Sequence, residues 1–478
     1  MVLASLFFYG WWNPIYLPLL LGLMTINYGV GMAIERAQVG RRALLVTGIV
    51  INLGALSYFK YANFFLGTID QLAGTSWNPA PILLPLAISF FTFQKIAYLV
   101  DVYRGEVRNQ GFVQYAFFVT FFPQLIAGPI VHYKEMVPQL LAKPRFSPQA
   151  TNIAIGLTIF TVGLFKKVVL ADGIAYYANP IFREAGAGHD VDFFLAWAGG
   201  IAYSLQLYFD FSGYSDMATG LARLVGLKLP INFDSPYKSK SMAELWRRWH
   251  ITLMRFMRAY LYFPLGGNRG SPSRQYFNVF IVMFLCGAWH GSGWTFLLFG
   301  IYHGLVMVVY RMWTQLRQAA GLTREYAWWD NGLARALTLM AWVFGLTLFR
   351  SPDLATFGQM ASGMAGLNGA NLPLHWQGAL APLASLFSTL HIGFENAPVM
   401  LNSQIVLWMA GLAAITFFTP NIYQLLSRFD PVLLEEPLAP TRWPLWRPGW
   451  LLALAVSLMA LTALLNMSNV SEFLYFQF

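Results

Sequence analysis

The chain has 478 residues, of which 57% are hydrophobic and only 11% are charged. An ordinary soluble domain has about 25% charged residues, so this composition excludes a soluble globular protein and indicates an integral membrane protein. The single cysteine, Cys286, excludes an intrachain disulfide and a cysteine-based metal cluster. No metal site, no bound cofactor and no nucleic-acid partner is expected.

Apolar runs recur along almost the whole chain. Because a helix that crosses the bilayer needs about 20 residues, we expect about nine to eleven membrane helices, some of them short or re-entrant. The clearest runs are residues 14–34, 43–66, 80–100, 151–170, 193–211, 276–312, 333–349, 403–419 and 449–466. The first residues carry no basic region, so they do not read as a signal peptide. No interval is typical of a soluble domain, and the prediction is therefore one all-α, polytopic membrane domain over residues 1–478.

Residues 121–140, FFPQLIAGPIVHYKEMVPQL, combine apolar length with helix breakers. Pro123, Gly128, Pro129 and Pro138 cannot all occupy one regular helix. Non-helical backbone at membrane depth is tolerated only where protein or water surrounds it. The segment is predicted to be re-entrant and to line a cavity.

Residues 206–220, QLYFDFSGYSDMATG, place Asp210, Ser212 and Asp216 at the end of a predicted span. A carboxylate inside a span normally pairs with a cation or lines a water-filled cavity. Two interpretations follow: the aspartates are structural partners of nearby arginines, which is slightly favoured, or they line the cavity and take part in the chemistry.

Positive charge is concentrated between Arg223 and Arg274, where ten Lys or Arg accompany two acidic residues. Basic segments beside membrane spans are retained on the cytoplasmic side, so this segment should face the cytoplasm. A loop lying on anionic lipid explains the charge alone. The alternative is that the segment also receives a polyanionic ligand.

Within that segment, residues 244–270 read ELWRRWHITLMRFMRAYLYFPLGGNRG. Apolar residues recur every three or four positions beside a set of arginines, which predicts an amphipathic helix lying at a membrane interface. A simple membrane anchor explains such a helix, but an anchor does not need His250. His250 is therefore a candidate functional residue.

Residues 286–304, CGAWHGSGWTFLLFGIYHG, carry two histidines in an apolar run. An ionisable side chain at membrane depth is functional by default, which makes His290 the first candidate. On one continuous helix His290 and His303 would point to different faces, but the glycines indicate a break with a new helix after GSG. Cys286 lies one turn before His290, so a covalent Cys–His mechanism is an alternative to a packed core cysteine.

Several motifs together resemble a known family. They are YFDFSGYSDMA, LWRRWH, YLYFPLGGNRG and WHGSGWTFLLFGIYHG, with KYANF (60–64), DVYRG (101–105), FPQLIAGPI (122–130) and the closing FLYFQF (473–478). The chain is similar to the membrane-bound O-acyltransferases, and most similar to their bacterial alginate O-acetylation branch. The resemblance implies a helical funnel, with re-entrant and interfacial helices, that takes acyl groups from a cytoplasmic thioester to an acceptor on the other side. It also implies that His290 is the essential catalytic residue and His250 the second polar residue.

The chain departs from the family pattern at two places. The family usually has an aspartate where this chain has Ala259, so no role of that carboxylate is carried over. The chain also starts later than is usual, which implies a missing first helix or a misassigned start.

The resulting prediction is an O-acetyltransferase of the bacterial inner membrane, with acetyl-CoA as donor and an exported polysaccharide such as alginate or cellulose as final acceptor. His290 acts as general base, because a neutral imidazole can take the proton of an attacking hydroxyl. Because His250 sits among the arginines, we expect it to lie closer to the donor phosphates and to water. Trp246, Arg247, Arg248, Arg255 and Arg258 are predicted to bind the donor. The predicted cavity-lining residues are Asp210, Ser212, Asp216, Asn268, Trp289 and His303.

The resemblance implies a periplasmic SGNH or esterase-like acetyltransferase and the polysaccharide synthesis machinery as partners, and membrane lipids are also expected. Two alternatives stay open. One is transfer of D-alanine from a carrier-protein thioester to teichoic acid, and the other is a transporter or flippase for an anionic or acylated lipid.

Overall fold

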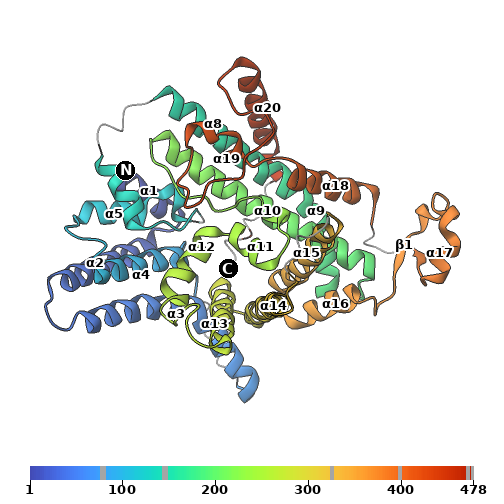
Figure 1. Cartoon of the computed structure of the whole chain (residues 1–478), viewed down its shortest axis with the longest axis horizontal. Coiled ribbons are helices and arrows are strands. Elements are labelled where there is room, and N and C mark those ends of the chain that lie inside the picture. Colours follow the sequence, from blue (N-terminus) through green and yellow to red (C-terminus); the bar gives the residue numbers. More distant parts are fainter. Residues whose placement is uncertain are drawn as a thin grey trace.

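The computed structural model describes residues 1–75, 82–126, 128–142, 149–322, 328–396, 401–469 and 474. Residues 80 and 81 of the predicted span 80–100, Ala127 of the segment 121–140, and all of the closing motif except Leu474 lie outside the described residues. The described chain is mostly helical, with two three-residue strands (Figure 1).

The elements follow one another along the chain, with the longer connections at residues 225–241 and 426–449. Before residue 143 they are α1 (Val2–Trp12), α2 (Leu17–Arg36), α3 (Arg41–Ala73), α4 (Ile88–Arg104), α5 (Phe112–Thr120), α6 (Phe122–Leu125) and α7 (Tyr133–Leu141). The middle of the chain contains α8 (Ala150–Phe165), a short π-helix (Lys166–Ala171), α9 (Asp172–Gly186), α10 (Phe193–Leu224), α11 (Met242–Arg248), α12 (Ile251–Met257), a second short π-helix (Arg258–Tyr262), α13 (Pro272–His290) and α14 (Trp294–Ala319).

The last part contains α15 (Trp328–Arg350), α16 (Leu354–Met364), β1 (Asn371–Pro373), α17 (Ala384–Thr389), β2 (Gly393–Glu395), α18 (Ser403–Phe418), α19 (Ile422–Leu425) and α20 (Trp450–Asn466). The two short strands pair in parallel, with Leu372 opposite Phe394. In Figure 1 they lie with α17 at one end of the molecule, α2, α4 and α5 lie at the opposite end, α3 extends from there toward α13, and α10 passes between.

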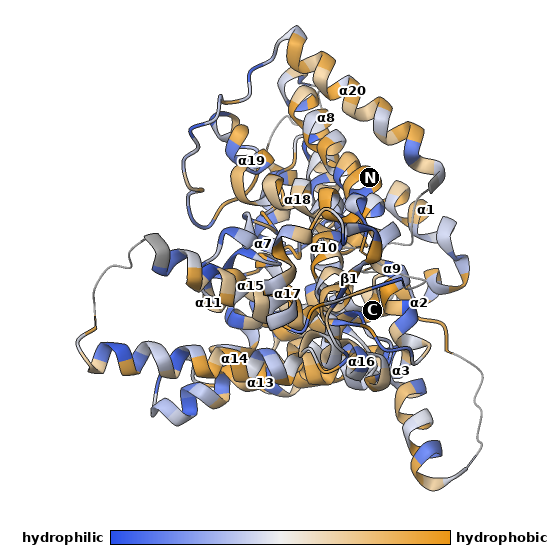
Figure 2. Cartoon of the chain, turned by 90° about the vertical axis from the view of Figure 1, so that its right-hand side faces the viewer, coloured by the Kyte–Doolittle hydropathy of each residue, from blue (hydrophilic) through white to orange (hydrophobic). Residues whose placement is uncertain are grey.

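Five helical segments of the described chain are long and apolar enough to cross a membrane: Pro14–Arg36, Arg41–Ala73, Ala150–Gly186, Trp294–Ala319 and Asp330–Arg350. The shorter helices α1, α18 and α20 are also apolar. Figure 2 shows hydrophobic residues along most of these helices. This is the pattern of a multi-pass membrane protein, and the all-α prediction is confirmed.

The helix breaks that the sequence predicted are present, together with one that it did not predict. The run 276–312 is divided into α13 and α14, as the glycines indicated. Residues 128–132, between α6 and α7, are non-helical and buried, as expected of a segment with so many helix breakers. The single amphipathic helix predicted within residues 244–270 is wrong, because α11 ends at Arg248 and α12 starts at Ile251, with a left-handed residue between them.

Three hydrophobic cores lie within the described chain. The first gathers around α10 and helices α11 to α15, the second lies among α1 to α7, and a smaller third one joins α8 to α19. Side chains of α4 contribute to the first two, because Phe93 belongs to the first core and Phe91 to the second. This helix therefore joins the N-terminal bundle to the part of the chain that carries the candidate histidines.

Helices α8 and α10 approach each other closely because glycines line their contact. A Cβ atom on Gly163 would lie 2.5 Å from the carbonyl oxygen of Gly213 and 2.7 Å from the amide nitrogen of Met217. A Cβ atom on Gly220 would lie 2.6 Å from the amide nitrogen of Phe160. Only glycine permits such backbone contact, which is a common device between membrane helices.

We therefore expect Gly163→Val to destabilise the protein. Overpacking costs about 1 to 3 kcal/mol when side chains can adjust, and here the obstacle is backbone, so the upper end of that range is expected. The unfolding midpoint of the purified protein in detergent should fall by several degrees. Gly54→Val is the matched control, because Gly54 lies inside α3 with nothing within 4 Å of an added Cβ. Equal midpoints for the two variants would contradict the assigned contact.

Candidate functional site

The turn between α13 and α14 places His290 at the end of a helix inside the protein. α13 ends at His290, and the chain continues extended through Gly291 and Gly293 before α14 begins. A Cβ atom on Gly291 would lie 2.2 Å from the ring of Phe296, so this position leaves no room for a side chain. The imidazole of His290 is 6% exposed.

Two side chains of α3 hold the carbonyl end of α13. The Lys60 ammonium donates to the carbonyl oxygens of Trp289 and His290, the latter at 3.1 Å, and to Ser89 Oγ at 3.3 Å. The Tyr61 hydroxyl donates to the Ala288 carbonyl at 2.7 Å. The last carbonyls of a helix have no partner within the helix, so these contacts supply donors that α13 itself cannot. Neither Lys60 nor Tyr61 was among the predicted site residues, although a lysine inside an apolar span was a usable signal.

His290 is surrounded by rings and one thiol. Its Nε2 atom lies 3.8 Å from Cys286 Sγ, which confirms that the two residues share one face of α13. The ring centroids of Trp289 and Phe349 are each 5.1 Å from that of His290, and Phe299 is at 6.0 Å. The ionisable side chains of His250, Lys60 and His303 lie close enough to act on His290 electrostatically.

His250 occupies the left-handed residue between α11 and α12, with φ of 45°. Its Nδ1 atom lies 2.9 Å from Asn232 Oδ1, which also accepts from the Thr252 hydroxyl at 3.0 Å. The Asn232 amide nitrogen donates to Ser215 Oγ at 3.2 Å. Because Asn232 Oδ1 is thus the acceptor, Nδ1 of His250 carries the hydrogen and Nε2 is the basic atom. His250 is 1% exposed, so the expectation that it lies closer to water is wrong.

The structure brings the two predicted catalytic histidines to one tryptophan. The ring centroid of Trp289 is 6.3 Å from that of His250 and 5.1 Å from that of His290. His303 lies on the other side of Phe299, with ring centroids 4.5 Å apart, and Trp246 is 5.2 Å from His303. Residues predicted from four separate positions of the sequence therefore form one buried cluster.

The aspartates of α10 pair with lysines, not with the arginines that the sequence suggested. Asp216 Oδ2 lies 2.6 Å from Lys166 Nζ, and Asp210 Oδ1 lies 2.7 Å from Lys167 Nζ. These consecutive lysines lie in the π-helix that follows α8. Because α8 and α10 are in close contact, this π-helix lies against α10. Ser212, between the aspartates, is 2% exposed.

Asn268 lies apart from the other predicted cavity residues. It is exposed, and its Oδ1 atom accepts from the Tyr262 hydroxyl at 2.6 Å and from Arg311 at 3.0 Å. The loop that carries it precedes α13, whereas His290 ends that helix, so the two residues lie at opposite ends of α13.

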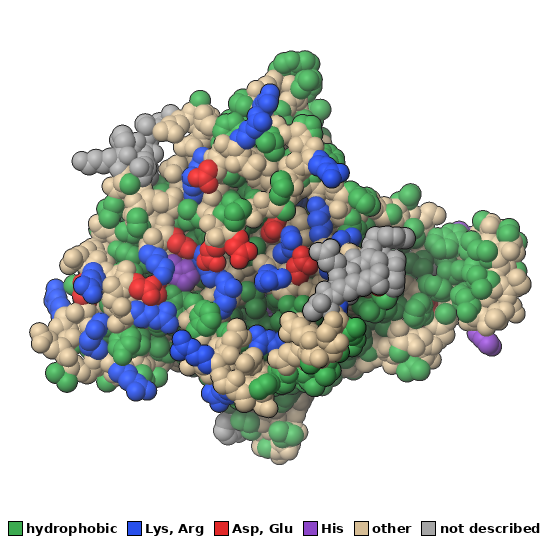
Figure 3. Space-filling view, in the orientation of Figure 1, with side chains coloured by type: hydrophobic (Ala, Val, Ile, Leu, Met, Phe, Trp, Pro, Cys, Tyr) green, Lys and Arg blue, Asp and Glu red, His purple; other side chains and the backbone are tan. Residues whose placement is uncertain are grey.

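Basic and acidic side chains gather across the centre of the face shown in Figure 3, over α11 and α12. Arg247 of α11 is exposed, whereas Arg248 pairs with Asp234 at 3.0 Å and with Glu244 at 3.1 Å. Trp246 is 3% exposed and points into the cluster with His303. Of these three predicted donor-binding residues, Arg247 is thus the most exposed, because the Arg248 side chain is 29% exposed and paired with carboxylates.

The other two predicted arginines also contact carboxylates. Arg255 lies 2.6 Å from Glu135 and 3.2 Å from Glu435. Arg258 lies 3.6 Å from Glu435, and both of these side chains are 55% exposed. A donor phosphate that binds here must therefore compete with Glu435.

A column of aromatic rings connects this charged face with the histidine cluster. We call it the aromatic column: Tyr260, Phe256, Phe93 and Trp289, whose successive ring centroids are 4.9, 4.2 and 5.0 Å apart. At its outer end the Tyr260 hydroxyl donates to Asp101 Oδ1 at 2.8 Å and lies 2.9 Å from His132 Nδ1. Asp101 and His132 were missed as site residues, although Asp101 lies in the DVYRG motif.

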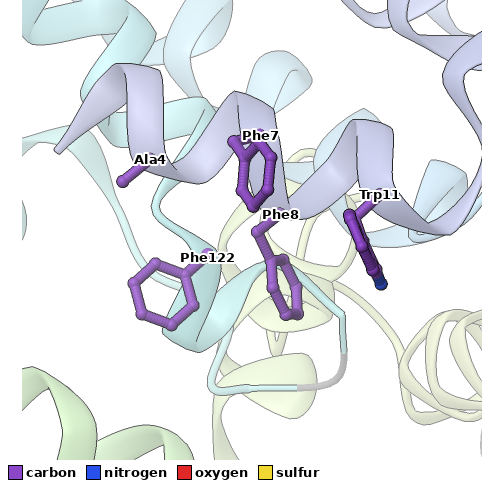
Figure 4. Close-up of a pocket in the computed structure, with 5 residues that line it drawn as sticks. All are labelled: Ala4, Phe7, Phe8, Trp11 and Phe122. Atoms are coloured by element: carbon purple, nitrogen blue, oxygen red, sulfur yellow. The ribbon is translucent and has the colours of Figure 1, made fainter.

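An open apolar pocket of about 420 Å³ lies away from this cluster, between α1 and α6 (Figure 4). It is lined by Ala4, Phe7, Phe8, Trp11 and Phe122. These side chains offer no acid, base or nucleophile. The pocket therefore presents an apolar surface and no catalytic group.

The chain is similar to proteins whose names describe acyl transfer. Residues 102–349 match the model of the membrane-bound O-acyltransferase family. A peptidoglycan O-acetyltransferase of Helicobacter pylori is 43% identical over 78% of this chain and 74% of that protein. A probable alginate O-acetylase AlgI of Pseudomonas aeruginosa is 36% identical over 100% of this chain and 94% of that protein.

More distant similarity extends to a second kind of acyl transfer. A teichoic acid D-alanyltransferase of Streptococcus thermophilus is 27% identical over 51% of this chain and 60% of that protein. The family match, the similarity to O-acetyltransferases and the helical membrane fold agree with one another. The chain belongs to the membrane-bound O-acyltransferase family and is an O-acyltransferase.

Proposed function

We propose that this protein takes an acetyl group from a cytoplasmic thioester, with acetyl-CoA as donor, and passes it across the bacterial inner membrane for O-acetylation of an extracytoplasmic polysaccharide. The observation that carries the proposal is the contact of His250 and His290 with the same tryptophan, Trp289. That tryptophan is the buried end of the aromatic column, whose outer end lies at the charged face. Because basic segments stay on the cytoplasmic side, the donor enters there.

In the proposed reaction His290 is the general base. Its neutral imidazole takes the proton of the acceptor hydroxyl while the hydroxyl oxygen attacks the thioester carbonyl carbon. The tetrahedral intermediate collapses by breaking the carbon–sulfur bond, and the imidazolium returns the proton to the leaving thiolate. General-base assistance of this kind contributes roughly 10² to 10⁴-fold. His250, with its tautomer fixed by Asn232, holds polar groups of the substrates at the other side of Trp289.

The acceptor polysaccharide is inferred from the names of the related proteins. Their names give alginate and peptidoglycan as polymers to test, and cellulose remains the third. In this proposal the whole chain acts as one domain, and the acetyl group passes to an SGNH or esterase-like periplasmic acetyltransferase that works with the polysaccharide synthesis machinery. D-alanyl transfer is the second candidate, supported by the 27% identical teichoic acid D-alanyltransferase.

We expect His290→Ala to abolish acetyl transfer by purified protein supplied with radiolabelled acetyl-CoA and a hydroxyl acceptor. The loss should exceed the range of roughly 10² to 10⁴-fold, because the imidazole also orients the acceptor. His250→Ala should give a partial loss, since it leaves the base in place. His189→Ala is the matched control, because His189 is an exposed histidine that pairs with Glu184.

Three other results would favour a different function or contradict the mechanism. Transfer from a D-alanyl carrier-protein thioester, but not from acetyl-CoA, would favour the second candidate. Movement of a lipid or anion without thioester cleavage would favour a transporter. Normal transfer by a normally abundant His290→Ala protein would overturn the mechanism.

We expect Cys286→Ala to retain most of the transfer activity. The thiol is fully buried beside His290 at 3.8 Å, where it serves as a packed core residue in the proposed mechanism. The measurement is kcat at saturating acetyl-CoA, with membrane abundance as control. A loss as large as that of His290→Ala would instead support a covalent acyl-cysteine intermediate.

We expect Arg247→Gln to raise the KM for acetyl-CoA about three- to tenfold and to weaken its dependence on salt, because one exposed cation is removed from the donor face. Arg247→Lys keeps the charge and should change KM less. Arg42→Gln, which removes an exposed arginine at the start of α3, is the control for net charge. Equal effects of Arg247→Gln and Arg42→Gln would mean that the arginines of the charged face serve only membrane insertion.

A further inference from the structure

We propose that Lys60 is a positioning residue for His290: its ammonium fixes the end of α13 so that the imidazole meets the reacting groups. This inference rests on the proposed function, and it adds a residue that the motif positions of the two histidines do not reveal. Its basis is the set of contacts between α3, α4 and the last residues of α13.

The location of Lys60 requires compensation. The side chain is 6% exposed and comes from the middle of α3, one of the segments long enough to cross a membrane. A charge at such depth costs several kcal/mol unless polar groups surround it. Here the surrounding groups are Ser89 Oγ and the carbonyls of Trp289 and His290.

The three hydrogen bonds that Lys60 donates indicate its role. An ammonium has three N–H donors, and the three acceptors account for all of them. No donor is left to contact a substrate or to stabilise an oxyanion. Lys60 therefore acts through α13, which makes it a positioning residue and not a catalytic one.

The two carbonyls that Lys60 holds belong to the two residues that matter most at the site. Trp289 touches both catalytic histidines, and the Lys60 ammonium lies 5.7 Å from its ring centroid. A positive charge at the carbonyl end of a helix is also favourable to the helix dipole. Beyond His290 the chain is extended at Gly291 and Gly293, so the helix does not continue past the carbonyls that Lys60 holds.

We expect Lys60→Met to lower kcat about 10²-fold while the KM for acetyl-CoA stays within about threefold, because a displacement of about 1 Å at the reacting groups has that cost. Lys60→Arg keeps donors and charge and should restore part of the rate. Lys95→Met is the matched control. Lys95 is also fully buried, on α4, but its ammonium lies over the ring of Phe91, 4.3 Å from its centroid. It should leave kcat within about threefold of the wild type.

A second measurement does not depend on activity. Cys286 is the only cysteine of the chain, is fully buried and lies one turn before His290. Its reaction rate with a small methanethiosulfonate reports local opening of the end of α13. Lys60→Met should raise this rate about tenfold or more, and Lys95→Met should not.

The outcomes separate this inference from the proposed function. Wild-type kcat and wild-type thiol reactivity in Lys60→Met would overturn the positioning role. Equal effects of Lys60→Met and Lys95→Met on both readouts would also overturn it, because loss of any buried charge would then suffice. If the wild-type protein transfers nothing from acetyl-CoA, the proposed function fails, whereas the thiol reactivity still tests Lys60.

Discussion

A helix that stops inside a membrane domain leaves carbonyl oxygens that neither water nor further helix can satisfy. In this protein the end of α13 meets that constraint with hydrogen bonds from Lys60 and Tyr61 of α3. Because the carbonyls are satisfied from outside, the helix can end at His290 without fraying. The glycines after it then turn the chain into α14, and the imidazole remains at the break among aromatic rings.

Ion pairs have two different roles in the molecule, and burial separates them. The pairs of Lys166 with Asp216 and Lys167 with Asp210 are almost fully enclosed, and removing one partner would leave a buried charge. The pair of Arg258 and Glu435 is more than half exposed. Exposed pairs contribute about 0 to 1 kcal/mol, so a phosphate can replace such a carboxylate at little cost. The buried pairs therefore fix residues 166 and 167, directly after α8, against α10, whereas a donor phosphate can exchange with Glu435 in the exposed pair.

Much of the fold could be predicted from the sequence because membrane helices are recognisable from apolar length alone. The break after His290 was also predictable, since Gly291 and Gly293 interrupt an apolar run. The break at His250 was not, because apolar residues on both sides of it keep a helical spacing, and periodicity does not reveal a single left-handed residue. Composition could not choose lysine over arginine as the partner of Asp210, since that choice depends on how closely α8 and α10 approach. Asn268 was misplaced for a related reason: nearness in sequence to a site motif says nothing about which end of a helix a residue lies on.

The left-handed backbone at His250 lowers the stability of the fold, whereas the imidazole is needed for the proposed chemistry. A residue other than glycine in this region costs on the order of 1 to 3 kcal/mol, which the surrounding packing must offset. Glycine would adopt the same φ without that cost, and asparagine at less cost. Either replacement would relax the backbone and remove the imidazole from Trp289. Selection for thermal stability alone would therefore favour glycine or asparagine at this position, at the cost of the imidazole beside Trp289.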